Sequence, residues 1–279
     1  MFLEALKAFF IGIVQGITEW LPVSSTGHMI LFDELVKLDV SDGFFELFEV
    51  VIQFGSILAV LVLFFDKLNP FSRKKDDEMK KKTWSLWFKV IVAVIPAAVI
   101  GLLFDDWFNE HFYNYVVVAI ALIVYGILFI VIERFNKNKQ KKYEDVYDID
   151  YLTAVKIGCF QVLSLIPGTS RSGSTIIGAS MVGVSRNAAA EFSFFLAIPV
   201  MLGASLLKVL KFAVNGVAMT KTEIVVLAVG MITAFLVSLV VIKFLMNFVR
   251  RHSFEAFGWY RIILGAVVIG YFIVKNFIF

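Results

Sequence analysis

Two short polar segments in an otherwise apolar sequence carry the residue types that could do chemistry. The first runs from Gln15 to His28 and reads QGITEWLPVSSTGH, and the second runs from Gln161 to Thr175 and reads QVLSLIPGTSRSGST. Hydroxyls and glycines beside an acid, a histidine and an arginine form a set that suits an anionic substrate. We therefore treat these segments as candidate sites and ask which elements position them.

In the first segment, Gln15 and Glu19 are four residues apart, which places both side chains on one face of a helix. Pro22 is expected to end that helix, because the residue before a proline is pushed out of the α region. The turn that follows is rich in hydroxyls, which belong to Ser24, Ser25 and Thr26. Glu19 with these hydroxyls and with phosphate oxygens would suit a hard cation such as Mg²⁺ or Ca²⁺.

The second segment repeats this plan with a basic residue. Pro167 and Gly168 interrupt one helix, and a new helix is expected to begin at Ser170. Exposed N–H groups at a helix N-terminus form an anion site, to which Arg171 adds a guanidinium that can contact two phosphate oxygens. The other hydroxyls of this helix start belong to Ser172 and Thr175. The competing interpretation of such small residues is close helix packing.

The remaining titratable candidates are one histidine and two acids. His28 is the histidine that lies inside a polar segment, and its near-neutral titration suits acid–base catalysis, although a structural role is the alternative. Glu49 and Glu191 each follow one segment at expected membrane depth and are candidate supporting acids. Histidines and cysteines do not occur in pairs at ligand spacing, so a transition-metal site is not predicted.

The composition indicates that lipid solvates the chain. Of the 279 residues 59% are hydrophobic and the mean hydropathy is +0.85, whereas soluble proteins are about 45–50% apolar. Stretches of about 20 apolar residues that could cross a bilayer lie at 48–66, 86–104, 115–133, 190–211, 223–248 and 258–278. Shorter stretches flank the polar segments, at 5–17 with 21–32 and at 153–166 with 172–184. We predict a single all-α polytopic membrane domain over 1–279, with six transmembrane helices and two re-entrant helix pairs.

Charge and repetition predict the topology. Basic residues gather in 67–89, in 134–142 and at Arg250–Arg251, and we interpret them as cytoplasmic topology signals, with no nucleic-acid partner expected. Both termini are then outside. The two polar segments align at an offset of 146, and three spans follow each, which predicts inverted repeats over 1–146 and 147–279. Such repeats with broken helices are typical of transporters.

The two segments together strongly resemble the undecaprenyl-diphosphate phosphatases of the bacitracin-resistance (BacA/UppP) type. The resemblance spans nearly the whole chain and includes FEVVIQ at 48–53 and EFSF at 191–194. It implies an enzyme of the bacterial cytoplasmic membrane that removes the terminal phosphate of the C55 lipid carrier at the outer face. That reaction regenerates the carrier for peptidoglycan synthesis and gives resistance to bacitracin.

The resemblance also implies roles for individual residues. The family's acidic motif falls on Gln15 and Glu19, and its phosphate-binding segment falls on Ser170, Arg171 and Thr175. Its hydroxyl turn and histidine fall on Ser24, Ser25, Thr26 and His28. The family often has Glu where this chain has Gln15, whose neutral amide adds no charge to a metal site, so Glu19 is the sole carboxylate of the motif.

From these assignments we expect Ser25 to be the nucleophile and His28 its base, while Arg171 and a divalent cation on Glu19 neutralise the phosphoryl charge. The alternative is direct attack by a water that Glu19 or His28 activates. A second functional class is a flippase that uses the inverted repeat to move a polyprenyl phosphate between leaflets. The PAP2 phosphatase class is excluded, because after Arg171 no histidine occurs until His252. The sequence leaves a homodimer open.

Overall fold

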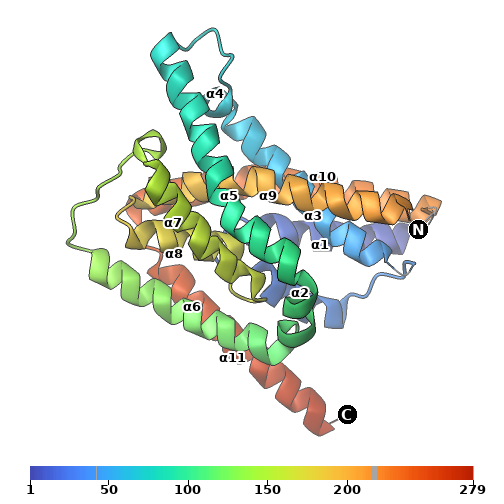
Figure 1. Cartoon of the computed structure of the whole chain (residues 1–279). Helices are drawn as coiled ribbons and strands as arrows, with labels where there is room; N and C mark the ends of the chain where they lie inside the picture. Colours follow the sequence, from blue (N-terminus) through green and yellow to red (C-terminus); the bar gives the residue numbers. More distant parts are fainter. Residues whose placement is uncertain (42, 215–218, 279) are drawn as a thin grey trace.

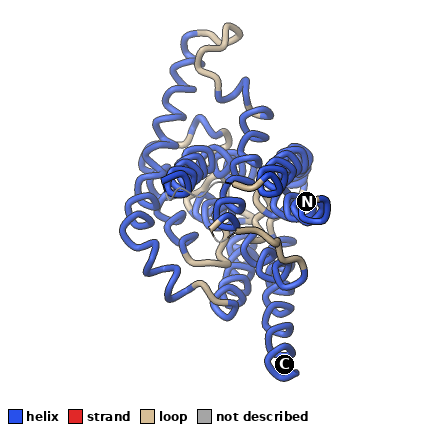
Figure 2. Tube along the Cα trace, turned by 90° about the vertical axis from the view of Figure 1, so that its right-hand side faces the viewer, coloured by secondary structure: helices blue, strands red, loops and turns tan. Residues whose placement is uncertain are grey.

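The computed structural model describes residues 1–41, 43–214 and 219–278, and this part of the chain forms helices and loops without strands (Figures 1 and 2). Within these ranges, six helices are long and apolar enough to cross a membrane. They are α3 (Phe44–Leu63), α5 (Asp77–Phe112), α6 (Tyr115–Asn136), α9 (Arg186–Val214), α10 (Lys221–Arg251) and α11 (Glu255–Ile278). The predicted all-α fold with six spans is confirmed.

Most of these helices extend beyond the predicted spans, because backbone hydrogen bonding continues past the point where charged residues lower the hydropathy. The largest extension is in α5, whose 36 residues start at Asp77 and contain Pro96. At 1.5 Å per residue it is about 54 Å long, well over the roughly 30 Å of a hydrocarbon core. The first span is shifted toward the N-terminus instead, since α3 ends at Leu63 and a single turn, α4 (Phe65–Leu68), follows.

Two pairs of short helices flank the polar segments, as predicted. The first pair is α1 (Phe2–Thr18) and α2 (Ser25–Leu35), and the second is α7 (Tyr151–Val162) and α8 (Arg171–Met181). The boundaries differ from the prediction by up to four residues. The piece expected at 21–32 becomes helical at Ser25, because the turn around Pro22 is not helical, and α7 changes into a 3-10 turn, η2 (Leu163–Leu165).

Each short pair is packed against a span from the other half of the chain. Helix α1 lies along α10 and α7 lies along α5, while α6 pairs with α11 (Figure 1). These approaches need glycine: a Cβ on Gly12 would lie 2.7 Å from the carbonyl oxygen of Gly230, and one on Gly158 would lie 2.1 Å from that of Ala93. The halves are thus interleaved into one unit, and their inverted orientation stays a prediction.

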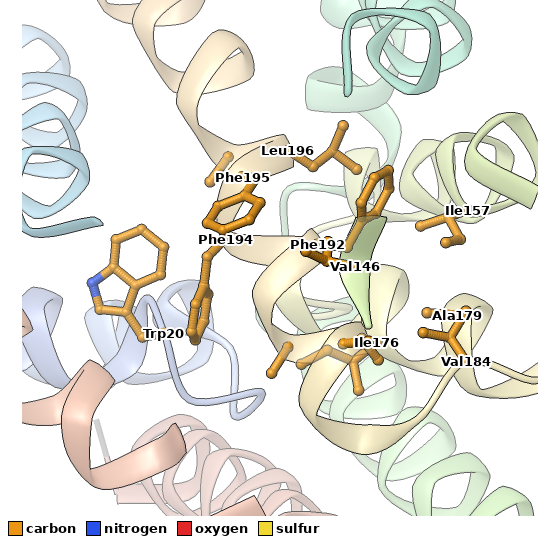
Figure 3. Close-up of a cluster of buried hydrophobic side chains, with 14 of the residues drawn as sticks. Trp20, Val146, Ile157, Ile176, Ala179, Val184, Phe192, Phe194, Phe195 and Leu196 are labelled. Carbon is orange, nitrogen blue, oxygen red and sulfur yellow. The ribbon is translucent and has the colours of Figure 1, made fainter. Parts of the chain in front are cut away.

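The hydrophobic core fixes the first polar segment against α9. Figure 3 shows Trp20, which follows Glu19 directly, pointing at Phe194. The two rings meet edge to face with centroids 5.2 Å apart, a favoured aromatic geometry, and both side chains are fully buried. The end of α1 is therefore anchored next to the residues of α9 that contact the second polar segment.

The loop between α6 and α7, at the left of Figure 1, provides a pH-dependent contact. The Tyr143 hydroxyl donates to the carboxylate of Asp150, the N-cap of α7, and holds the pKa of Asp150 well below its usual range. An acid with a lowered pKa stabilises the fold above its unfolded-state pKa of about 3.9, and this contribution is lost as the pH falls below that value.

Tyr143→Phe is therefore expected to lower the free energy of unfolding at pH 7, and with it the thermal midpoint. The loss should be at most about 1 kcal/mol, because the Asp150 side chain is half exposed. The deficit should shrink below about pH 4. Tyr147→Phe is the matched control, because its hydroxyl donates to the uncharged carbonyl of Lys67. A Tyr143→Phe deficit that is the same at both pH values would show that the hydroxyl does not act through Asp150.

Candidate active site

The two turns that precede α2 and α8 share a rare backbone conformation. Ser24 and Ser170 have φ angles of 72° and 70°, and they are the non-glycine residues with positive φ in the described chain. Each is an N-cap: Ser24 Oγ accepts from the Gly27 N–H at 3.4 Å and Ser170 Oγ from the Gly173 N–H at 3.2 Å. Such strain costs about 1–3 kcal/mol per residue and persists only where the surroundings fix it.

Arg261 of α11 provides part of that support. Its fully buried guanidinium donates to the carbonyl oxygen of Pro22 at 3.2 Å in the first turn, and to those of Gly168 at 2.8 Å and Thr169 at 3.0 Å in the second. One side chain therefore holds both turns together. The sequence analysis missed Arg261, although an arginine inside the apolar stretch 258–278 is the kind of intramembrane charge that signals a site.

The predicted phosphate-binding residues of the second turn make contacts within the protein. Ser172 Oγ lies 3.3 Å from the Glu19 carbonyl oxygen, and Thr175 Oγ1 lies 2.7 Å from Ser193 Oγ. Gly168 has a φ of 92°, and a Cβ there would lie 2.6 Å from the Val118 carbonyl oxygen, so a side chain does not fit. Their roles as substrate ligands stay predictions.

The two turns are also joined by a buried charged pair. Arg171 Nη2 lies 3.2 Å from Glu19 Oε1, and Gln15 Nε2 donates to Glu19 Oε2 at 2.9 Å, as the four-residue spacing predicts. Arg171 Nη1 donates to the Ser193 carbonyl oxygen at 2.9 Å. Its Nε is buried without a hydrogen-bond partner in the described part of the chain. Arg171 thus lies in the protein interior, and the described residues do not use its Nε as a donor.

A cavity of about 200 Å³ lies next to Gln15, which hydrogen-bonds to Glu19 of this pair. The predicted residues Gln15, Ser25, Thr26 and Glu49 line it together. Residues that the sequence analysis did not select complete the wall: Met29, Val50, Ile52, Gln53 and Tyr113. Gln15 contacts both the cavity and Glu19, so the Arg171–Glu19–Gln15 chain connects the buried guanidinium with the space in front of Ser25.

His28 is held differently from the expected base. Its Nδ1 lies 2.7 Å from the Ser24 carbonyl oxygen and its Nε2 lies 2.7 Å from the Tyr260 hydroxyl, with the two rings stacked. Since a carbonyl oxygen can only accept, Nδ1 carries a hydrogen, and in the neutral ring Nε2 therefore accepts from the Tyr260 hydroxyl. Both ring nitrogens are engaged, so His28 must release Tyr260 before it can take a proton from Ser25.

Glu191 lies apart from the residues that meet at the cavity. Its Oε2 lies 2.5 Å from Lys67 Nζ and its Oε1 accepts from Asn187 at 3.4 Å. These partners belong to the connection after α3 and to the first turn of α9. The structure thus brings Glu49 to the cavity and engages Glu191 in an ion pair elsewhere.

Comparisons with known proteins identify the family of the chain. A family model described as "Bacitracin resistance protein BacA" matches residues 8–267. The chain belongs to the BacA family. It is 58% identical to an undecaprenyl-diphosphatase of Enterococcus faecalis over 273 residues, which are 98% of this chain and 99% of that protein. It is 61% identical to undecaprenyl-diphosphatase 1 of Clostridioides difficile, over 97% of each chain.

In this BacA-family chain the two turns carry different residues at the positions that the predicted repeat aligns. At the offset of 146, Ser25 corresponds to Arg171, and Glu19 corresponds to Leu165. The counterpart of Gln15 is Gln161, whose buried amide lacks a hydrogen-bond partner among the described residues. The first turn therefore carries the acid and the cavity hydroxyls, and the second carries the guanidinium.

Hard oxygen donors suit the cation that the sequence predicts. In the described residues no group of three or more His, Cys, Asp or Glu side chains could share a metal ion. Mg²⁺, however, is usually held by one or two carboxylates together with substrate phosphates. Glu49 and Gln15 line the cavity and Glu19 adjoins it through Gln15, so one or two carboxylates are available there. A carboxylate oxygen that accepts one hydrogen bond keeps a second lone pair for a cation.

Proposed function

We propose that the chain is an undecaprenyl-diphosphate phosphatase of the bacterial cytoplasmic membrane. It converts undecaprenyl diphosphate to the monophosphate and inorganic phosphate, which recycles the lipid carrier for peptidoglycan synthesis and confers bacitracin resistance. The Arg171–Glu19–Gln15 chain supports the proposal, since it links a buried guanidinium to Gln15, which lines the same cavity as Ser25. The names of the full-length relatives support it.

In the proposed reaction, Ser25 Oγ attacks the terminal phosphorus and the bond to the bridging oxygen breaks, so undecaprenyl monophosphate leaves. Water then hydrolyses the phosphoserine and releases inorganic phosphate. Ser25 is the first residue of α2, so helical N–H groups and their dipole favour the anion there. Arg171 stabilises the phosphoryl oxygens through its free Nε, and Glu19 or His28 takes the proton of Ser25.

We include a divalent cation, Mg²⁺ or Ca²⁺, in this proposal, with Glu19, Glu49 and Gln15 as its protein ligands. When bound, it would neutralise charge on the diphosphate oxygens.

The prenyl chain stays in the membrane lipid between helices. We place the cavity and both termini outside, because Tyr113 of the cavity lies at the opposite end of α6 from the basic residues 134–142. The chain is a monomer or a homodimer, and light scattering of the purified protein distinguishes the two.

Phosphate release from a C55 diphosphate by purified protein in detergent tests the activity. Turnover is expected in micelles, where leaflets do not exist, and a flippase would release no phosphate there. EDTA is expected to reduce the rate at least about tenfold, and Mg²⁺ or Ca²⁺ to restore it. A rate that EDTA does not change would remove the cation from the proposal but keep the hydrolase.

Ser25→Ala separates the two routes of attack. If Ser25 is the nucleophile, turnover should fall by about a thousandfold or more, and acid quenching of the wild type should trap a phosphoserine that mass spectrometry locates at Ser25. Ser72→Ala is the matched control, because Ser72 lies in the loop between α4 and α5, where its hydroxyl accepts from the Lys74 N–H. Near-normal turnover of Ser25→Ala would instead assign the attack to water.

A further inference from the structure

A second cavity, of about 360 Å³, lies among the ends of three spans. It is lined by Asn136, the last residue of α6, by Arg186, the first of α9, and by Arg250 near the end of α10. Lys137 and Lys141, from the loop that leaves α6, also line it. We name this cavity the basic pocket.

The basic pocket is separate from the candidate active site. Tyr113, just before α6, lines the active-site cavity, whereas Asn136 at the far end of α6 lines the basic pocket. The 22 residues of α6 span about 33 Å at 1.5 Å per residue. A ligand of the basic pocket therefore lies at the opposite end of α6 from Tyr113 and the active-site cavity, and the reaction proposed above does not use this pocket.

The charges around the basic pocket are unbalanced. Arg186 is neutralised by the buried carboxylate of Glu133, which it contacts through Nε at 3.0 Å and Nη2 at 2.6 Å. Lys137, Lys141 and Arg250 have no ion pair among the residues that the structure describes. Glu144 also lines the pocket, so four basic groups face two carboxylates and two positive charges remain.

The placement of these groups favours a bound anion over a simple topology signal. A lysine that serves only as a topology signal can be fully exposed to solvent. Lys141 is instead partly buried, and this burial lowers the pKa of its ammonium group. The N-terminus of the 29-residue helix α9 lies at the same pocket, and its dipole adds further positive potential. Because the pocket lies at the ends of membrane spans, it is at the level of phospholipid headgroups.

We propose that the basic pocket binds a phosphate group, supplied by the headgroup of an anionic phospholipid at the membrane surface. Basic pockets between transmembrane helices are a recurrent means of recognising such headgroups. The volume also falls in the range of small-molecule sites, about 300–1,000 Å³. Lys141 and Arg250 contact the phosphate oxygens, and Lys137 at the rim contributes long-range attraction.

Native mass spectrometry of the purified full chain, titrated with phosphatidylglycerol or with phosphatidylcholine, tests this site. The wild-type protein is expected to bind phosphatidylglycerol at least about tenfold more tightly than phosphatidylcholine. The double variant Lys141→Gln/Arg250→Gln should weaken phosphatidylglycerol binding by about 30-fold, at roughly 1 kcal/mol per basic residue. The control Lys74→Gln/Arg134→Gln removes the same charge from exposed residues outside the pocket and should stay within about twofold.

A parallel titration with inorganic phosphate identifies the source of the ligand. If phosphate binds wild type but not the pocket variant, and displaces the lipid at equal concentration, the site is a phosphate site without lipid preference, and the headgroup assignment is wrong. Equal losses in the pocket variant and in the control would show general surface attraction and overturn the proposal. All three proteins are first matched for thermal midpoint and for phosphatase turnover, which the distant variants should leave unchanged.

Discussion

Replacing Arg171 with alanine is expected to lower kcat for phosphate release at least about a hundredfold, equivalent to about 3 kcal/mol of transition-state stabilisation. The guanidinium is buried and is linked to the cavity-lining Gln15 through Glu19, with Nη2 on Glu19, Nη1 on the Ser193 carbonyl oxygen and Nε without a protein partner among the described residues. Negative charge that develops on a nearby phosphoryl group would therefore interact with a fixed positive charge in the protein interior, where charge interactions are strongest.

Arg171→Lys sharpens this prediction, because lysine keeps the charge but cannot contact Glu19 and the Ser193 carbonyl oxygen as a planar fork. Its kcat should lie between those of wild type and Arg171→Ala. Arg134→Ala serves as the control, since Arg134 is 64% exposed and pairs with Glu255 at the surface. A change of less than threefold in Arg171→Ala would remove this residue from the reaction.

Local spacing predicts the parts of the site that neighbours in sequence build. The Gln15–Glu19 hydrogen bond follows from a separation of four residues, and the helix starts at Ser25 and Arg171 follow from prolines and hydroxyl-rich turns. Patterns of this kind depend on residues within one helix or turn, so they can be predicted from a single amino-acid sequence.

Contacts between distant segments could not be predicted in the same way. The three-residue spacing between Ser25 and His28 suggested that His28 is a base for Ser25. It could not show that the hydroxyl of Tyr260, 232 residues away from His28, already contacts His28 Nε2. Hydropathy placed Glu49 and Glu191 at similar depth, but depth does not identify partners. Helix packing decides that one carboxylate lines the cavity and the other meets Lys67.

Arg261 shows the same limit and leads to the second large prediction. Arg261→Met is expected to lower kcat at least about tenfold and to destabilise the fold by several kcal/mol. Three buried carbonyl oxygens, of Pro22, Gly168 and Thr169, would lose their charged donor, at about 1–3 kcal/mol for each unsatisfied group. Since Arg261 donates hydrogen bonds to both strained turns, the position of one turn relative to the other should become less fixed.

A positioning role differs from general stabilisation in its kinetic signature. Arg261 holds the backbone of both turns and does not line the cavity, so kcat should fall more than KM rises, because ground-state binding tolerates a displaced donor better than the transition state does. Arg261→Lys keeps one or two of the three contacts and should recover part of kcat, even if Arg261→Met does not fold. Lys275→Met, on the exposed end of the same helix, is the control. If Arg261→Lys is folded and destabilised but has the wild-type kcat, Arg261 supports the fold alone, and the geometry of the two turns does not limit the reaction.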